Sequence, residues 1–346
     1  VITMIIMNKI SHFIVISVLA ATAFTACKGA KSTASAETSA PQIVGPAFQA
    51  DSAYAFCAKQ CEFGPRTMNS EAHDKCRQWI VDKFRSYGMD VEEQKKDLKG
   101  WDGTMLRSTN IIARFKPEAE QRILLCAHWD TRPWSDNDPD EANWHTPVMG
   151  ANDGASGVAV MIEIARLLQK DTTLNYGIDF VCFDAEDYGT PQWESNQDNS
   201  ESTWALGAQE WARQIAASAP KDAEGNMISP YEYGILLDMV GGEGSRFYQE
   251  GFSLKYASRI VSKVWSAAND AGVGSYFVSE PGGFITDDHN PINEIGIPCI
   301  DIIPYYPDCK QSSFGPTWHT IHDDMEHIDR NTLHAVGQTV IQTLFN

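Results

Sequence analysis

Positively charged residues are scarce in this sequence of 346 residues. It holds 27 Lys and Arg against 46 Asp and Glu, which gives a formal net charge of −19. A surface of this sign repels phosphate backbones and anionic lipid headgroups, so nucleic-acid binding is excluded as a main function. Tryptophan, by contrast, is abundant: the 10 Trp exceed average usage, and Trp that the core does not need often lines a ligand pocket.

The sequence also lacks an apolar run long enough to span a bilayer. The run from Phe13 to Phe24 has the length of a signal-peptide core. The sequence Phe24-Thr25-Ala26-Cys27 resembles the lipobox of bacterial lipoproteins, in which the cysteine becomes the acylated N-terminus; a plain secretory signal with an incidental cysteine is the alternative. We therefore expect a signal peptide over residues 1–26 and a flexible tether over residues 27–45 that begins with lipidated Cys27. The implied location is the periplasm or the outer membrane, with membrane contact through the lipid anchor alone.

A zinc-binding CxxC pair is absent as well. Besides Cys27, seven cysteines remain, an odd number that leaves at least one thiol free. Three of them lie in apolar strand-like runs, which favours buried free thiols: Cys126, Cys182 and Cys299. The other four leave disulfide pairing open: Cys57, Cys61, Cys76 and Cys309. Since no repeat or interdomain linker follows residue 46, we expect one catalytic domain over residues 46–346. We also expect the protein to be a monomer.

Between residues 86 and 303, β-rich runs alternate with helical patterns, which predicts an α/β domain with helices layered on a sheet. The expected strands are Ile111 to Phe115, Ile123 to Ala127, Ile178 to Phe183, Tyr233 to Leu237 and Pro298 to Ile303. The last four are nearly continuous apolar runs, typical of strands buried on both faces. The expected helices are Ser70 to Tyr87, Ser156 to Gln169, Thr203 to Ala217, Leu254 to Ala271 and Arg330 to Leu344.

Acidic and histidine residues follow each of these four buried strands. They are His128-Trp129-Asp130, Asp184-Ala185-Glu186-Asp187, Asp238 and, after a loop, His319, with Asp153 just before a helix. Taken singly, Asp153 could cap that helix and either histidine could be a satisfied polar residue. Because ligands bind outside the carboxyl ends of strands in open α/β sheets, we expect the side chains to converge there. The carboxylates gathered with two His at one edge would repel one another without a cation, which predicts a divalent metal site.

These motifs, in this order and spacing, resemble the zinc-dependent aminopeptidase-like superfamily. The matching residues are His128-x-Asp130, Gly150-x-Asn152-Asp153, Asp184-x-Glu186-Asp187, Leu237-Asp238-Met239 and the late His319. Within it, the sequence is similar to the glutaminyl-peptide cyclotransferases of the single-zinc α/β type, on three further features: Trp193, Asp287-Asp288-His289, and Phe314-x-x-x-Trp318-His319-Thr320. The resemblance implies a three-layer α/β fold in which helices flank a central, mostly parallel mixed sheet.

The resemblance also implies one zinc ion per chain, bound by Asp153, Asp187 and His319, with a fourth position open. The family usually has Glu where this chain has Asp187, which is shorter by one methylene. His128 and Asp130 are expected to form a hydrogen-bonded network beside the metal, or to bind a second one.

The implied activity is conversion of the N-terminal glutamine of peptides and proteins to pyroglutamate with release of ammonia. Glu186 would shuttle the proton, and Asp238 and Asp287 would orient the leaving amide. Trp193, Phe314 and Trp318 would wall the glutamine pocket; the alternative for these aromatics is core packing.

Two other functions remain open. A two-zinc aminopeptidase would use the same ligands, with Glu186 activating a metal-bound water. A non-catalytic binding domain on the same scaffold is the third hypothesis, although such domains commonly lose metal ligands or the base, and both are present here.

Overall fold

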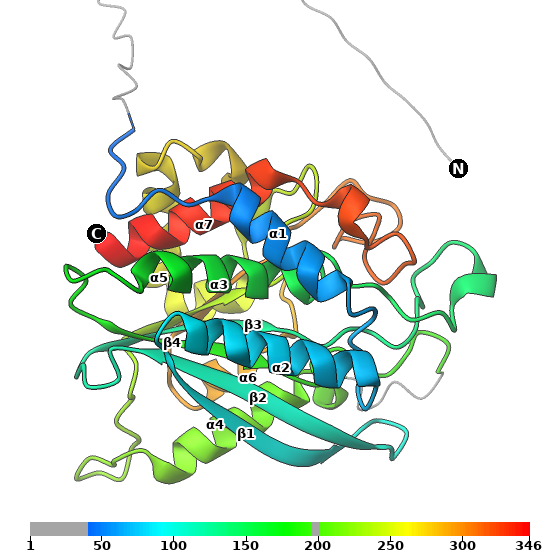
Figure 1. Cartoon of the computed structure of the whole chain (residues 1–346), viewed down its shortest axis with the longest axis horizontal. Coiled ribbons are helices and arrows are strands. Elements are labelled where there is room, and N and C mark those ends of the chain that lie inside the picture. The colour runs from blue at the N-terminus through cyan, green and yellow to red at the C-terminus, as the bar shows by residue number, and fades with distance from the viewer. Residues whose placement is uncertain (1–40, 195–200) are drawn as a thin grey trace, which may run out of the picture. The chain divides into compact units, whose positions relative to one another are not determined.

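The computed structural model describes residues 41–194 and 201–346. The main sheet has the strand order β1-β2-β4-β3-β5-β8 (Figure 1). Its strands are β1 (Asp90–Lys99), β2 (Met105–Phe115), β3 (Arg122–His128), β4 (Gly177–Phe183), β5 (Tyr233–Leu237) and β8 (Cys299–Ile302). The four strands β4, β3, β5 and β8 are parallel, and β1 and β2 form an antiparallel edge. The carboxyl ends of the four parallel strands therefore lie at one edge of the sheet.

Helices cover both faces of this sheet. They are α1 (Ala50–Cys61), α2 (Glu71–Ser86), α3 (Ala155–Leu168), α4 (Leu206–Ser218), α5 (Gly251–Asp270), α6 (His289–Glu294) and α7 (Arg330–Phe345). In Figure 1, α3 and α7 lie above the sheet and α4 lies below it. A second, two-stranded sheet pairs β6 (Phe247–Gln249) with β7 (Phe277–Pro281).

Successive side chains of each central strand enter different cores, because side chains alternate across a sheet. In β3, Leu125 packs in the larger core under α1, α3, α5 and α7, whereas Leu124 packs in the smaller core under α4 and α6. The nearly continuous apolar sequences of β3 and β4 follow from this burial on both faces. The expected three-layer α/β fold with a mostly parallel sheet is confirmed.

The five expected strands and five expected helices are all present, with ends that shift by a few residues. Strand β1 was not predicted, because seven of its ten residues are charged, which is how an edge strand avoids pairing with another chain. Helix α4 begins at Leu206 rather than Thr203, since Ala205 adopts a left-handed backbone (φ 53°) that a helix cannot continue through.

The seven cysteines in the described part of the chain are free thiols, and Cys126, Cys182 and Cys299 are buried as expected. None of the helices among the described residues is long and apolar enough to cross a membrane. The predicted signal peptide, Cys27 and most of the tether lie outside the described residues.

Candidate active site and metal centre

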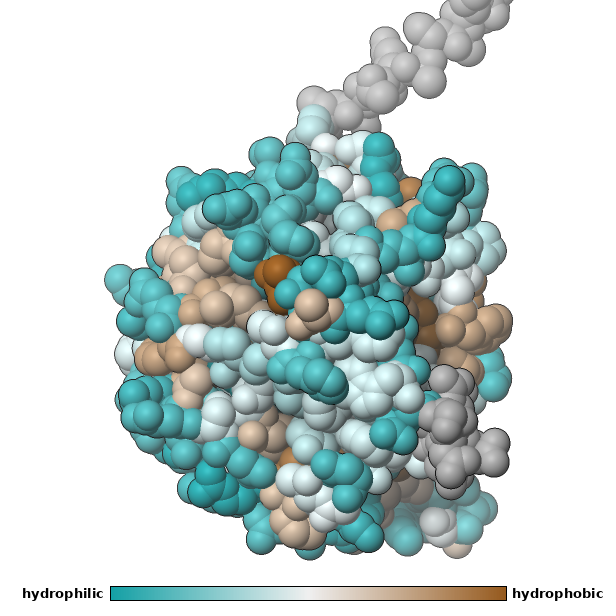
Figure 2. Space-filling model, turned by 90° about the vertical axis from the view of Figure 1, so that its right-hand side faces the viewer, coloured by the Kyte–Doolittle hydropathy of each residue, from teal (hydrophilic) through white to brown (hydrophobic). Residues whose placement is uncertain are grey.

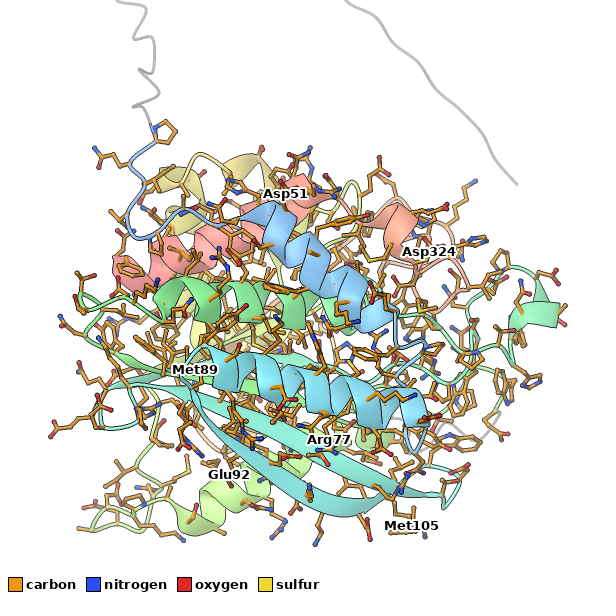
Figure 3. All side chains as sticks on the ribbon, in the orientation of Figure 1. Asp51, Arg77, Met89, Glu92, Met105 and Asp324 are labelled. Carbon is orange, nitrogen blue, oxygen red and sulfur yellow. The ribbon has the colours of Figure 1, made fainter. Side chains whose placement is uncertain are left out.

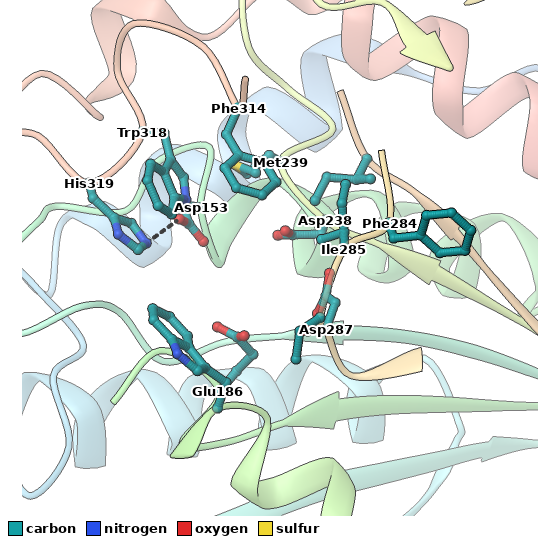
Figure 4. A pocket seen from close by; sticks show the side chains of 13 residues that line it. Asp153, Glu186, Asp238, Met239, Phe284, Ile285, Asp287, Phe314, Trp318 and His319 are labelled. Atoms are coloured by element: carbon teal, nitrogen blue, oxygen red, sulfur yellow. Dashed lines mark ion pairs between the residues drawn. The ribbon is translucent and has the colours of Figure 1, made fainter. Parts of the chain in front are cut away.

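A pocket of about 260 Å³ lies at the carboxyl edge of the parallel strands (Figure 4). Its polar wall consists of His319 and four carboxylates: Asp153, Glu186, Asp238 and Asp287. Its aromatic wall consists of Trp204, Phe284, Phe314 and Trp318. The sequence prediction that acidic residues and His319 converge at this edge is thus met by the geometry.

Asp153, Asp187 and His319 form a compact donor set. One ligand atom from each residue lies within 4.8 Å of the other two, and all three residues are buried. The Nε2 atom of His319 lies 3.2 Å from Asp187 Oδ1 and 3.6 Å from Asp153 Oδ2. Two buried carboxylates and an imidazole match the donor preference of catalytic zinc, and the shorter Asp187 still reaches the other two residues.

Asp153 is held at the start of α3 by backbone contacts. The Asp323 carboxylate accepts hydrogen bonds from the backbone N–H groups of Asn152 (2.7 Å) and Asp153 (3.0 Å). Gly157, in the first turn of α3, packs so closely on β5 that a Cβ there would lie 2.2 Å from the Leu237 carbonyl oxygen. This close approach of α3 to β5 brings Asp153 beside Asp238, which follows Leu237 in the chain.

A second donor set shares Asp153 with the first. It consists of His128, Asp153 and Asp238. His128 Nε2 lies 2.9 Å from Asp153 Oδ1 and 3.2 Å from Asp238 Oδ1. The two oxygens of Asp153 thus face one histidine each, so the donor geometry alone accommodates one metal or two.

Asp130 lies in the site but belongs to neither donor set. Its two carboxylate oxygens accept the backbone N–H groups of Glu186 and Asp187, each at 3.1 Å. Asp130 Oδ1 also faces His128 Nδ1 at 3.7 Å. Of the two predicted roles for Asp130, this arrangement fits the hydrogen-bonded network. Asp130 fixes the backbone of Glu186, the predicted proton shuttle, and of Asp187, the predicted zinc ligand.

The His319 ring lies beside two tryptophans, and its second nitrogen faces a carboxylate. Trp318 stacks on the imidazole at 3.7 Å between ring centroids, and Trp204 lies parallel to it at 5.9 Å. Asp136 Oδ1 lies 3.5 Å from His319 Nδ1 and receives a hydrogen bond from Arg132. Burial opposes ionisation of Asp136, but its hydrogen bonds with Arg132 and His319 lower its pKa, so it faces the imidazole as a carboxylate.

The three carboxylates with a predicted role in the reaction lie close together and are buried: Glu186, Asp238 and Asp287. Burial raises the pKa of Glu186 well above its usual range, and the nearby charges of Asp187 and Asp287 add to the effect. Burial and the charge of Asp238 raise the pKa of Asp287 to about 7. Burial also raises the pKa of Asp238 itself. A raised pKa favours the protonated form of each acid, which suits groups that transfer or share protons.

Backbone strain is concentrated around the pocket. Six non-glycine residues of the described chain have a positive φ angle, and four of them lie in or beside the site: Ala185, Ala205, Met239 and His319. Such residues persist only where the surrounding structure enforces them. They turn the chain at the points where Glu186, Trp204, Asp238 and His319 enter the pocket.

The aromatic wall differs from the sequence prediction at one position. Phe314 and Trp318 line the pocket as predicted and contact each other at 4.7 Å. Trp193 is not among the lining residues; it packs instead against Trp134, Trp144 and His145. Its place is taken by Trp204, which was predicted to lie inside a helix. The left-handed backbone of Ala205 makes that helix begin only at Leu206, which leaves Trp204 on the preceding loop, where it faces the pocket.

Comparisons with known proteins agree with this geometry. Residues 110–344 match peptidase family M28. A glutaminyl cyclase from Bacteroides thetaiotaomicron, solved with N-acetylhistamine bound, is 50% identical, with a TM-score of 0.80 over 88% of this chain and 99% of that one. A leucine aminopeptidase precursor from the same organism is 49% identical, with a TM-score of 0.79 over the same shares. The bovine glutaminyl-peptide cyclotransferase is 25% identical over 65% of this chain, and the chain spans 62% of that relative's length.

Proposed function

This chain belongs to peptidase family M28, and within that family we propose that it is a glutaminyl-peptide cyclotransferase. The observation that carries the proposal is the carboxylate Asp287, placed beside Glu186 and Asp238 in a small pocket walled by Phe314, Trp318 and Trp204. The substrates are peptides and proteins that begin with glutamine, and the products are their pyroglutamyl forms and ammonia. Its 50% identity with a bacterial glutaminyl cyclase supports the same conclusion.

The reaction needs no external nucleophile. The α-amine of the N-terminal glutamine attacks its own γ-carboxamide carbon, a new C–N bond forms, and the bond to the amide nitrogen breaks. A zinc ion bound by Asp153, Asp187 and His319 would supply a Lewis acid for the γ-carbonyl oxygen. Holding the amine close to the carbonyl in a small pocket provides much of the remaining effect.

Glu186 is placed to carry the proton between the two nitrogens. It takes a proton from the attacking amine and delivers it to the departing nitrogen, which leaves as ammonia. Burial raises the pKa of Glu186, which strengthens its affinity for the proton that it takes from the amine. Asp238 and Asp287 face the same space and orient the amide nitrogen by accepting its hydrogen bonds.

The two-zinc aminopeptidase is the second candidate, and the donor set of His128, Asp153 and Asp238 is the observation in its favour. One assay separates the two. Purified mature protein is incubated with Gln-initiated and Leu-initiated peptides, while ammonia, free amino acid and bound metal are measured in parallel. The cyclotransferase releases ammonia, with no free amino acid and about one zinc per chain. Free amino acid with about two zinc per chain would overturn the proposal.

We also propose that the protein is exported and anchored by a lipid on Cys27, as a monomer. Metabolic labelling with a radioactive fatty acid tests the anchor: the wild type is labelled and Cys27→Ser is not. If neither protein is labelled, the lipid anchor is refuted and the segment is a plain secretory signal. Light scattering of the purified domain tests the monomer.

A further inference from the structure

A second hollow, of about 590 Å³, adjoins the active-site pocket. The two share three lining residues: Trp204, Thr286 and Asp287. We call this hollow the α4–α6 groove, because its walls come from α4, from α6 and from the first two turns of α5. A chain whose first residue occupies the pocket can therefore continue into the groove past these shared residues.

A row of aromatic side chains leads from the pocket along the groove; we call Phe284, Phe252 and Tyr256 the aromatic row. Phe284 lines the pocket, on the side away from His319 in Figure 4. Its ring contacts Phe252 at 5.0 Å, and Phe252 in turn stacks with Tyr256 at 6.3 Å. Phe252 and Tyr256 both line the groove.

The aromatic row is exposed to an unusual degree. Phe284 is 69% exposed and Tyr256 is 44% exposed, so two of the five exposed large hydrophobic residues in the described chain lie here. Met105, at the start of β2, is another of the five (Figure 3). Single exposed hydrophobic residues need no explanation, but a connected group beside a pocket indicates a binding surface. On the face drawn in Figure 2, hydrophobic side chains occur only in small separate groups among hydrophilic ones.

Hydrogen bonds and close packing hold the backbone that carries Phe252 and Phe284. The buried carboxylate of Glu250 accepts the backbone N–H groups of Phe252 (2.8 Å) and Ile285 (3.1 Å) and lies 3.0 Å from His289 Nε2. It thereby joins the first turn of α5, the pocket loop and α6. Phe284 packs directly on the backbone of Gly251, where a Cβ would lie 2.6 Å from its ring. A surface whose backbone is fixed in this way loses less conformational entropy when it binds a partner than a mobile loop would.

We propose that the α4–α6 groove binds the part of the peptide substrate that follows the N-terminal glutamine, and that the aromatic row selects an aromatic or large apolar side chain there. This inference rests on the proposed cyclotransferase function and extends it to a substrate class. The two centroid separations along the row correspond to about three residues of extended chain. The preferred side chain is therefore at about the third or fourth position of the peptide. The polar rim carries both signs, Arg213 and Glu294, and so gives no preference for a charged residue.

The test compares two tetrapeptide amides, Gln-Gly-Gly-Phe and Gln-Gly-Gly-Ala, by their kcat/KM for ammonia release. The wild type is expected to favour the Phe peptide about fivefold, mainly through a lower KM, as an aromatic contact on this scale provides. Tyr256→Ala brings the ratio close to one, and Tyr256→Phe keeps it. Met105→Ala is the control for loss of an exposed hydrophobic side chain elsewhere. Because the ratio is taken within each protein, it does not depend on the fraction that is correctly folded.

Each outcome decides one proposal. An equal kcat/KM for both peptides in the wild type would overturn the proposal that the groove selects a side chain of the substrate. An unchanged ratio of kcat/KM in Tyr256→Ala would overturn it as well. If no peptide releases ammonia, the cyclotransferase proposal fails instead. The groove is then tested by calorimetric binding of the pyroglutamyl forms of the two peptides, and equal affinities would overturn it.

Discussion

The buried carboxylate of Asp287 allows a quantitative prediction about stability. Burial and the charge of Asp238 raise its pKa to about 7 in the folded protein, whereas an unfolded Asp titrates near 3.9. The folded state therefore keeps a proton that the unfolded state releases between these two pH values. Stability is lost as the pH rises through that window, because the unfolded state binds fewer protons than the folded one.

Asp287→Asn removes this penalty and keeps the size of the side chain. With pKa values of about 3.9 and about 7, the penalty in the metal-free wild type is about 1.5 kcal/mol at pH 5 and about 4 kcal/mol at pH 8. The stability difference between the variant and the wild type should therefore shift by about 2.5 kcal/mol in favour of the variant between these pH values. Above pH 8 the shift levels off, since Asp287 is then ionised in both states.

The assay is urea denaturation of both proteins at pH 5 and pH 8, after removal of metal with a chelator. Asp90→Asn, at an exposed position on β1, serves as the control and should show no such shift. The variant should also lose cyclisation activity. A stability difference that stays constant between pH 5 and pH 8 would refute the reasoning, because it would mean that Asp287 titrates alike in both states.

Three further predictions concern the site. Glu186→Gln should keep zinc binding but lose at least about 100-fold in kcat, as expected for loss of a general acid–base group, and loss of the metal instead would show that the carboxylate is a ligand. Asp136→Asn should weaken zinc binding about 10- to 100-fold in a chelator competition, because Asp136 orients His319 through its Nδ1 atom; an unchanged affinity would mean that stacking by the tryptophans suffices. Trp204→Leu should lower kcat/KM about tenfold and Trp193→Leu much less, since only Trp204 lines the pocket, and equal losses would contradict this difference.

The convergence of the site was predictable from the sequence because it depends on topology. Parallel strands end at one edge, so the residues that follow β3, β4 and β5 had to meet there. The same argument placed His128, Glu186 and Asp238 together without any knowledge of side-chain contacts. The layers were predictable in the same way, because nearly continuous apolar runs are typical of strands that are buried on both faces.

The aromatic wall was not predictable to the same extent. Trp193 and Trp204 both lie near the long loop after β4, where no periodicity indicates which way a side chain points. Trp204 faces the pocket because Ala205 adopts a left-handed backbone, and alanine gives no sequence signal for that conformation. A glycine or asparagine at position 205 would have been such a signal.

The supporting carboxylates were missed for a related reason. Asp136 and Asp323 lie in polar loops, where Asp is the ordinary residue of turns. Their roles depend on long-range contacts, to His319 and to the backbone of Asp153, that local patterns do not encode. Only burial distinguishes them from the many solvated acids of this chain.

Cyclisation and peptide hydrolysis place opposite demands on water in the pocket, and this difference helps to distinguish the two functions. Hydrolysis needs a water molecule at the metal, whereas cyclisation is an attack within the substrate and is harmed by competing water. In this protein the rings of Trp318 and Trp204 both lie roughly parallel to the His319 imidazole, and Phe314 packs against Trp318. The donor sets are compatible with either reaction, but apolar walls around the metal ligands favour the reaction that excludes water. The aromatic surroundings of the donor atoms therefore distinguish the function more strongly than the donor atoms do.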